Sequence, residues 1–177
     1  MTQTGFIVCV PEAESLVGGL RERFDSSAAL GVPAHITVLF PFMPPGDITA
    51  SVLRRIEGAL RNAQAFSFSL ARVARFPATA YLEPEPTAPF VALTESLVRA
   101  FPQFPPFGGE FPTVIPHLTV AHGNFKEAEA AEAELASVLA SHGPISSVCS
   151  SLVLMENASG TWRQMHAFPL ARLPAAA

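Results

Sequence analysis

In the first part of the chain, short apolar runs typical of strands alternate with a segment whose apolar positions recur every four residues. A short apolar run over residues 5–10 predicts a strand, and the four-residue spacing of apolar side chains over residues 11–24 predicts a helix with one buried stripe. Residues 35–40, HITVLF, are rich in β-branched and aromatic side chains and stop at a proline, which predicts the second strand.

The same order of elements then occurs a second time. Asp47 caps a predicted helix over residues 48–60, and alternating Phe and Ser residues from Phe66 predict the strand that follows it. The remaining elements are a short strand near Tyr81, a helix from Thr87, a strand from His117, a helix over 126–140, and a strand over 145–155 in a hairpin with 162–170.

Each half therefore has the order helix, His-x-Thr strand, helix, strand. The two motif histidines lie 82 residues apart, and the strands that begin at Phe66 and Ile145 lie 79 residues apart, as expected of an old duplication. We expect one α+β domain over residues 1–177, bilobal and pseudo-twofold, with antiparallel sheets lining a central cleft and helices outside. Its lobes span roughly residues 1–78 and 79–177, and this division leaves open an exchange of strands between them.

Two His-x-Thr triplets carry the candidate chemistry. In a strand, residues i and i+2 point to one face, so His35 lies beside Thr37 and His117 beside Thr119, while the aliphatic residues between them face the core. If the two strands meet in a cleft, two imidazoles and two hydroxyls surround a phosphate-sized volume. One imidazole can act as a base and the other as an acid, and the threonines can donate hydrogen bonds to phosphate oxygens.

These motifs carry a resemblance to a known family. HITV at His35 and HLTV at His117, with their surroundings VPAHITVLFPF and PHLTVAHG, resemble the 2H phosphoesterase superfamily. Within it, the chain is similar to bacterial proteins of the 2′-5′ RNA ligase family, which include RNA 2′,3′-cyclic phosphodiesterases. The resemblance implies a bilobal fold with a central cleft, metal-independent chemistry on phosphodiesters, and catalytic roles for His35, Thr37, His117 and Thr119.

Composition and charge favour a small substrate. The formal net charge is −4 and no apolar run reaches membrane-spanning length, so we expect no binding to duplex DNA and no membrane partner. The start of the chain shows no signal-peptide pattern, so we expect a cytoplasmic protein, and we expect a monomer. Cys9 and Cys149 lie in apolar surroundings and are expected to be buried hydrophobes without a disulfide.

Other side chains are candidates for substrate contact. Phe42 and Trp162 offer rings on which a base can stack, and Arg163 offers a charged fork for a phosphate. The remaining histidines show no metal-binding spacing, so we expect loop roles for them, no metal and no cofactor. Those histidines are His122, His142 and His166.

The sequence thus favours a metal-independent phosphodiesterase that opens 2′,3′-cyclic phosphates of nucleotides or short RNA ends, with the 2′-phosphate product that the resemblance suggests. Two alternatives stay open. One is a 2′-5′ RNA ligase or 2′-5′ phosphodiesterase, and the other is a non-catalytic module that binds nucleotides or RNA ends. The pattern does not assign the acid and the base between His35 and His117.

Overall fold

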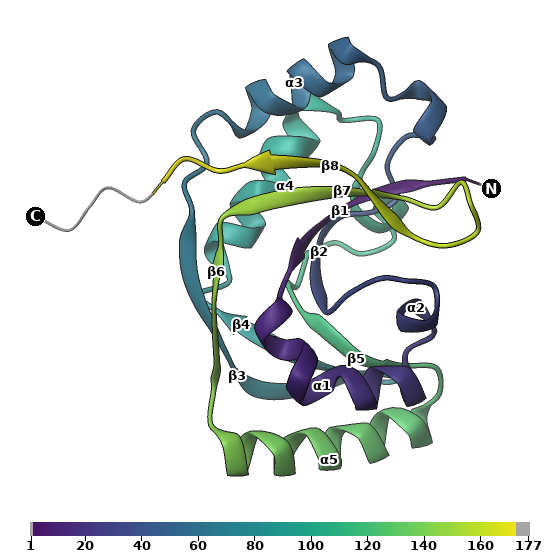
Figure 1. The fold of residues 1–177 in the computed structure, drawn as a ribbon, viewed down its shortest axis with the longest axis vertical. Helices are drawn as coiled ribbons and strands as arrows, with labels where there is room; N and C mark the ends of the chain where they lie inside the picture. Colours follow the sequence, from purple (N-terminus) through teal and green to yellow (C-terminus); the bar gives the residue numbers. More distant parts are fainter. Residues whose placement is uncertain (1, 173–177) are drawn as a thin grey trace, which may run out of the picture.

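Eight antiparallel strands form one curled sheet in the computed structural model, which describes residues 2–172 (Figure 1). Their order across the sheet is β6-β3-β4-β5-β2-β1-β7-β8. The strands are β1 (Thr4–Cys9), β2 (His35–Leu39), β3 (Phe66–Phe76), β4 (Thr79–Glu85), β5 (Leu118–His122), β6 (Ile145–Cys149), β7 (Ser151–Glu156) and β8 (Arg163–Pro169). The helices are α1 (Pro11–Phe24), α2 (Ser26–Ala29), α3 (Ala50–Leu60), α4 (Ala88–Ala100) and α5 (Phe125–His142).

The two motif strands meet at the middle of this sheet. Strands β2 and β5 are neighbours, and only Ile36 and Leu118 are paired in register between them. On one side of this junction lie β1, β7 and β8, and on the other lie β4, β3 and β6. The prediction of an α+β fold with antiparallel strands is confirmed, and the short pairing of β2 with β5 joins the sheets of the two halves into one.

Strands cross from each half of the chain to the other half of the sheet. Strand β3 follows β2 in the sequence but pairs with β4, and β7 comes late in the sequence but pairs with β1. The single strand predicted over residues 145–155 is two strands that break at Ser150. The break is needed because β6 pairs with β3 at one end of the sheet order, while β7 pairs with β1 and β8 near the other.

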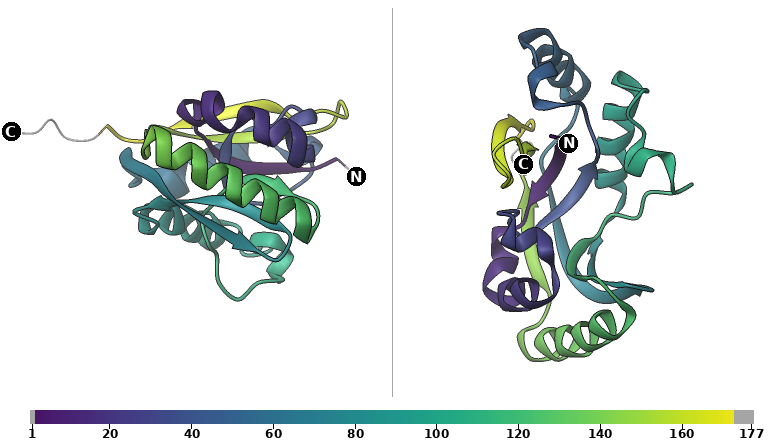
Figure 2. Two further views of the ribbon diagram at one scale, coloured as in Figure 1. Left: turned by 90° about the horizontal axis from the view of Figure 1, so that it is seen from below. Right: turned by 90° about the vertical axis from the view of Figure 1, so that its right-hand side faces the viewer.

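The long helices cover the sheet in pairs, and the pairing also crosses between halves. Helices α1 and α5 contact each other and pack on β5, whereas α3 and α4 contact each other and α4 packs on β2 (Figure 2). Helix α1 therefore precedes β2 in the sequence but covers the strand of the second motif. No helix within residues 2–172 is long and apolar enough to cross a membrane.

The start of α3 differs from the expected cap. Asp47 belongs to a short 3₁₀ turn, Pro45–Asp47, so it ends too early to cap the helix. Thr49 takes that role, because its side-chain oxygen accepts a hydrogen bond from the Val52 N–H at 3.3 Å. The N-cap of α3 is therefore Thr49 and not Asp47, which the sequence predicted.

An aromatic cluster fills the core between α4 and the sheet. The Phe42 ring is 4% exposed and meets the rings of Phe6, Phe101 and Phe104 at centroid distances of 4.9 to 5.2 Å. These edge-to-face contacts add to the burial of large apolar surfaces. Of the two cysteines, Cys149 is buried and Cys9 is half-buried, and neither forms a disulfide.

Replacement of Phe42 tests this core. We expect Phe42→Ala to lower the free energy of unfolding by about 3–5 kcal/mol, because it removes a buried ring and leaves a cavity. Phe111 is 56% exposed, so the matched change Phe111→Ala should cost about 0.5 kcal/mol or less. Urea unfolding of both variants measures the difference, and equal losses would contradict the position of Phe42 in the core.

Candidate active site

The motif residues alternate between the core and the open face of their strands. Ile36 and Val38 are buried under α4, while His35 and Thr37 are partly exposed. Strand β5 repeats the pattern, with Leu118 and Val120 buried and the residues at 117 and 119 partly exposed. The predicted two-faced character of both strands is therefore present.

The register between the strands brings the two motifs together. Because Ile36 pairs with Leu118 in an antiparallel ladder, His35 stands opposite Thr119 and Thr37 stands opposite His117. Each histidine thus faces the threonine of the other motif.

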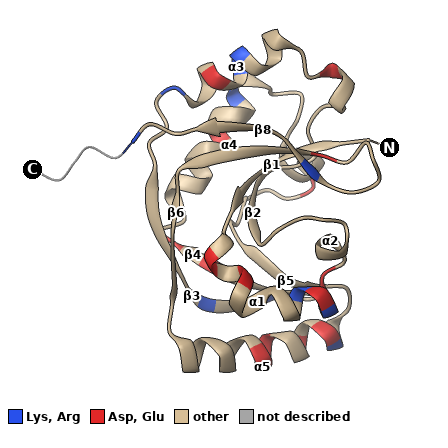
Figure 3. Ribbon diagram, viewed as in Figure 1, with Lys and Arg blue, Asp and Glu red and all other residues tan. Residues whose placement is uncertain are grey.

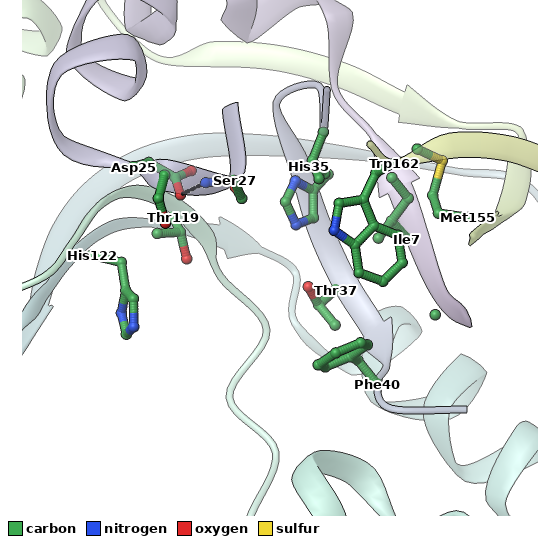
Figure 4. Close-up of a pocket in the computed structure, with 13 residues that line it drawn as sticks. Ile7, Asp25, Ser27, His35, Thr37, Phe40, Thr119, His122, Met155 and Trp162 are labelled. Atoms are coloured by element: carbon green, nitrogen blue, oxygen red, sulfur yellow. Dashed lines mark hydrogen bonds between the residues drawn. The ribbon is translucent and has the colours of Figure 1, made fainter. Parts of the chain in front are cut away.

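A pocket of about 320 Å³ opens on this face of the sheet (Figure 4). His35, Thr37 and Thr119 lie on its wall. His117 is not part of this wall, and its ring packs against Tyr81 and Phe76 at centroid distances of 5.1 and 5.4 Å. The pocket is therefore built mainly on the β2 side of the motif pair.

Both motif histidines are held through the same ring nitrogen. The Nδ1 atom of His35 is 2.8 Å from the carbonyl oxygen of Pro33, and the Nδ1 atom of His117 is 2.6 Å from that of Ile115. A carbonyl oxygen can only accept, so each Nδ1 carries the hydrogen. The Nε2 atom of each ring is then the one with a free lone pair for proton exchange.

Burial shifts both histidines toward the neutral form. Removal from water is the main cause that lowers the pKa of His35, the nearby charges of Arg21 and His117 act in the same direction, and the hydrogen bond to Pro33 and the Asp25 carboxylate oppose them. Together these effects bring the pKa from 6.5 to about 4. Burial also lowers the pKa of His117, and His122 adds to this effect. Both shifts favour the uncharged imidazole at neutral pH.

One end of the pocket is apolar and aromatic. Phe40 and Trp162 lie edge to face at a centroid distance of 5.8 Å, and Ile7 and Met155 continue the wall (Figure 4). A β-carbon on Gly5 would come within 2.9 Å of the Phe40 ring, so the missing side chain makes room for that ring. This end offers flat apolar surfaces.

The other end of the pocket is polar. His122, Asp25, Ser26 and Ser27 join Thr119 there. His122 follows the second motif on β5, and its Nδ1 atom is 2.8 Å from the Thr79 hydroxyl. His122 is on the pocket wall, whereas a loop role was expected for it. In the sequence, its position five residues after His117 is the only signal for this place. The signal depends on β5 extending as far as His122.

A buried cation supports this polar end from behind. Arg21 is 2% exposed, and its guanidinium donates to the Asp25 carboxylate at 3.0 and 3.1 Å and to the Val32 carbonyl at 3.0 Å. Asp25 in turn accepts the Ser27 N–H at 3.0 Å, which caps α2. An arginine on a helix is normally exposed to solvent, so the sequence offered no signal for this burial.

The remaining sequence candidates lie in different surroundings. Trp162 is on the pocket wall, as described, but Phe42 lies in the aromatic core and Phe40 occupies the wall instead. Phe40 and Phe42 both follow β2, but the Phe40 ring faces the pocket and the Phe42 ring faces the core. The Arg163 side chain is 67% exposed, pairs with Glu156, and is not on the wall.

The pocket is nearly free of formal charge. Among the residues that the structure describes, its wall carries no Lys or Arg, and Asp25 is its one carboxylate. Most charged residues lie on the helices, and β2 and β5 themselves contain no Lys, Arg, Asp or Glu (Figure 3). Within residues 2–172, no group of three or more His, Cys, Asp or Glu side chains is arranged to hold a metal ion.

Comparisons with solved structures show the same fold. The chain resembles Escherichia coli LigT, in crystals with 3′-AMP and with NADP+, at 17% identity in each case, with TM-scores of 0.58 and 0.59 and coverage of 96% of this chain and 98% of LigT. It also resembles TT0787 of Thermus thermophilus, at 15% identity and a TM-score of 0.60 over 97% of this chain and all of the other.

No curated protein matches the chain in a comparison of sequences. A family model does match, and it extends over residues 9–161, which include both His-x-Thr strands and the polar end of the pocket. The chain therefore belongs to the 2′-5′ RNA ligase superfamily, the 2H phosphoesterases.

Proposed function

We propose that the protein is a phosphodiesterase that opens 2′,3′-cyclic phosphates of nucleotides or short RNA ends and leaves a 2′-phosphate. The observation that carries this proposal is the matched pair of imidazoles, each with Nδ1–H held by a backbone carbonyl and each across the strand junction from a threonine. Two such groups can take a proton from the attacking oxygen and give a proton to the departing oxygen when a phosphodiester is hydrolysed.

The proposed reaction is an in-line displacement by water. One motif histidine takes a proton from the attacking water at Nε2, while the other, protonated when the anionic substrate binds, gives its Nε2 proton to the departing ribose 3′-oxygen. The new bond joins the water oxygen to phosphorus, and the bond between phosphorus and O3′ breaks. Thr37 and Thr119 donate hydrogen bonds to the non-bridging oxygens, where negative charge grows. These four side chains supply each step, so no metal ion is needed.

The charge of the pocket suits a diester. A phosphodiester carries one negative charge, whereas a phosphomonoester takes a second charge above a pKa of about 6. Neutral donors and one carboxylate at Asp25 hold a monoanion better than a dianion. This difference favours binding of the substrate over retention of the product.

The aromatic end of the pocket suits a nucleobase. Phe40 and Trp162 offer flat surfaces next to the histidine of β2, and stacking is worth about 1–3 kcal/mol per base. LigT, a structural neighbour, has been crystallised with 3′-AMP and with NADP+, both of which contain adenine. A base held on these rings would bring its ribose phosphate toward the motif residues.

Replacement of the motif histidines tests the reaction. With nucleoside 2′,3′-cyclic monophosphates in EDTA, we expect the wild type to form 2′-monophosphates, and His35→Ala and His117→Ala each to reduce kcat by about 10²–10⁴-fold. His142→Ala is the matched control, because His142 lies at the end of α5, outside the pocket, and should keep full activity. Chromatography that separates 2′- from 3′-monophosphates reads out both rate and regiochemistry.

Other outcomes of this assay point elsewhere. Loss of activity in EDTA that added metal restores would overturn the metal-independent mechanism. Turnover of 2′-5′-linked dinucleotides but not of cyclic phosphates would favour the 2′-5′ phosphodiesterase or ligase. Tight nucleotide binding without any product would favour a binding module.

The pKa shifts predict an acidic optimum. The reaction needs one proton shared by the two histidines, and both pKa values are lowered from 6.5, that of His35 to about 4. As pH falls from 7, more enzyme holds that single proton, so kcat/KM should rise and reach its maximum below pH 6.5. Below both pKa values the second proton binds and kcat/KM falls. A maximum of kcat/KM above pH 7.5 would be inconsistent with these shifts.

Replacement of the pocket tryptophan tests the base site. We expect Trp162→Ala to raise KM by about 5–150-fold, the range that corresponds to loss of one stacked base, with a smaller change in kcat. Trp162→Phe keeps a ring and should retain most of the affinity. Steady-state kinetics on cyclic mononucleotides measure the effect, and an unchanged KM in Trp162→Ala would remove this residue from the site.

A further inference from the structure

The two motif histidines differ in what lies behind them. Each Nδ1–H donates to the carbonyl of the residue two positions earlier, Pro33 for His35 and Ile115 for His117. The intervening residue is Ala34 in the first motif and Pro116 in the second. The peptide that holds His35 therefore has an N–H, and the peptide that holds His117 does not.

That N–H has a charged partner on α1. The Glu14 carboxylate accepts the Ala34 N–H, although Glu14 lies 20 residues earlier in the sequence. The Pro33–Ala34 peptide is trans, so its N–H and its carbonyl point in opposite directions. Carboxylate, peptide group and imidazole thus form one continuous chain of hydrogen bonds.

The same short segment is held at its other polar groups. Arg21, two helical turns after Glu14, donates to the Val32 carbonyl at 3.0 Å, and its Nη1 atom is 3.8 Å from the Glu14 carboxylate. The Val10 N–H donates to the Ala34 carbonyl at 2.8 Å. These contacts hold the peptide groups on both sides, and the contact with Glu14 is the one made by the Pro33–Ala34 peptide through its own N–H.

We propose that Glu14 is a positioning residue for His35, acting through the Pro33–Ala34 peptide. The carboxylate fixes the plane of this peptide, and the Pro33 carbonyl then fixes the tautomer and the direction of the His35 ring. The effect of Glu14 on rate rests on the proposed function. The hydrogen bonds from Glu14 through the peptide to His35 are present without substrate.

The chain of contacts predicts a specific effect of removing the carboxylate. Glu14→Ala frees the Ala34 N–H, so the peptide can rotate and the Pro33 carbonyl can leave the His35 Nδ1–H. A catalytic group displaced by about 1 Å costs up to about 10²-fold in rate. We expect kcat to fall about 10- to 100-fold with little change in KM, because Glu14 is not on the pocket wall.

Glu14→Gln and Glu22→Ala complete the set of variants. A glutamine amide oxygen can still accept the Ala34 N–H, so Glu14→Gln should restore kcat to within about threefold of the wild type. Glu22 lies on the same helix and is exposed, and Glu22→Ala removes the same charge and should leave kcat unchanged. Arg21 is unsuitable for this test, because its replacement would leave the buried Asp25 carboxylate without its cationic partner.

The decisive readout is the tautomer of each histidine, measured by ¹⁵N NMR of the imidazoles at pH 8 without substrate. In the wild type both rings should carry the hydrogen on Nδ1. In Glu14→Ala the Nδ1–H population of His35 should fall while that of His117 stays constant, and Glu14→Gln should preserve both. A folded Glu14→Ala protein, checked by its thermal melting, with an unchanged His35 tautomer would overturn the proposal.

This design separates the proposal from the proposed function. If cyclic phosphates are not substrates, the NMR result still tests whether Glu14 orients His35. A changed tautomer with unchanged kcat on an active substrate would overturn the kinetic role of the contact.

Discussion

The contact between β2 and β5 is the constraint on which the site depends. One residue pair, Ile36 with Leu118, joins the two halves of the sheet, and both side chains are fully buried. Because side chains alternate along a strand, burial of these two turns the His and Thr neighbours of both to the opposite, open face. Core packing and the candidate chemistry are thus the two faces of one junction, and a shift of one residue in either strand would bury the histidines and expose the core.

The limited length of that pairing also matters. Strands that stay paired along their length would fill the space between the motifs with backbone hydrogen bonds. Here the strands separate after one pair, and residues from α2, β1 and the segment before β8 close the space into a pocket. The walls are contributed by segments far apart in the sequence, including Asp25 and Trp162. Crossed packing of α1 on β5 and α4 on β2 holds these segments around the junction.

The pseudo-symmetry of the motifs does not extend to their supports. Charged groups of α1 lie behind His35, and Arg21 and Asp25 contribute to its electrostatic environment. His117 packs instead against the rings of Tyr81 and Phe76, and the residue before it has no N–H to offer. Both histidines make the same hydrogen bond to a backbone carbonyl, but charged groups support it in the first motif and aromatic rings pack against the imidazole in the second. A duplicated site can acquire two distinct roles in this way.

The sequence by itself determined the elements, the α+β class and the two motif strands, because these follow from local periodicity and from the alternation of side chains along a strand. It also indicated Trp162, which lies on the pocket wall. Only the tertiary structure decided that the strands form one sheet, that Phe40 rather than Phe42 faces the pocket, and that His122 lines it. The same holds for Arg21 and Glu14, whose partners lie up to 20 residues away. Such contacts depend on how distant segments pack, and no local pattern of residue types encodes that packing.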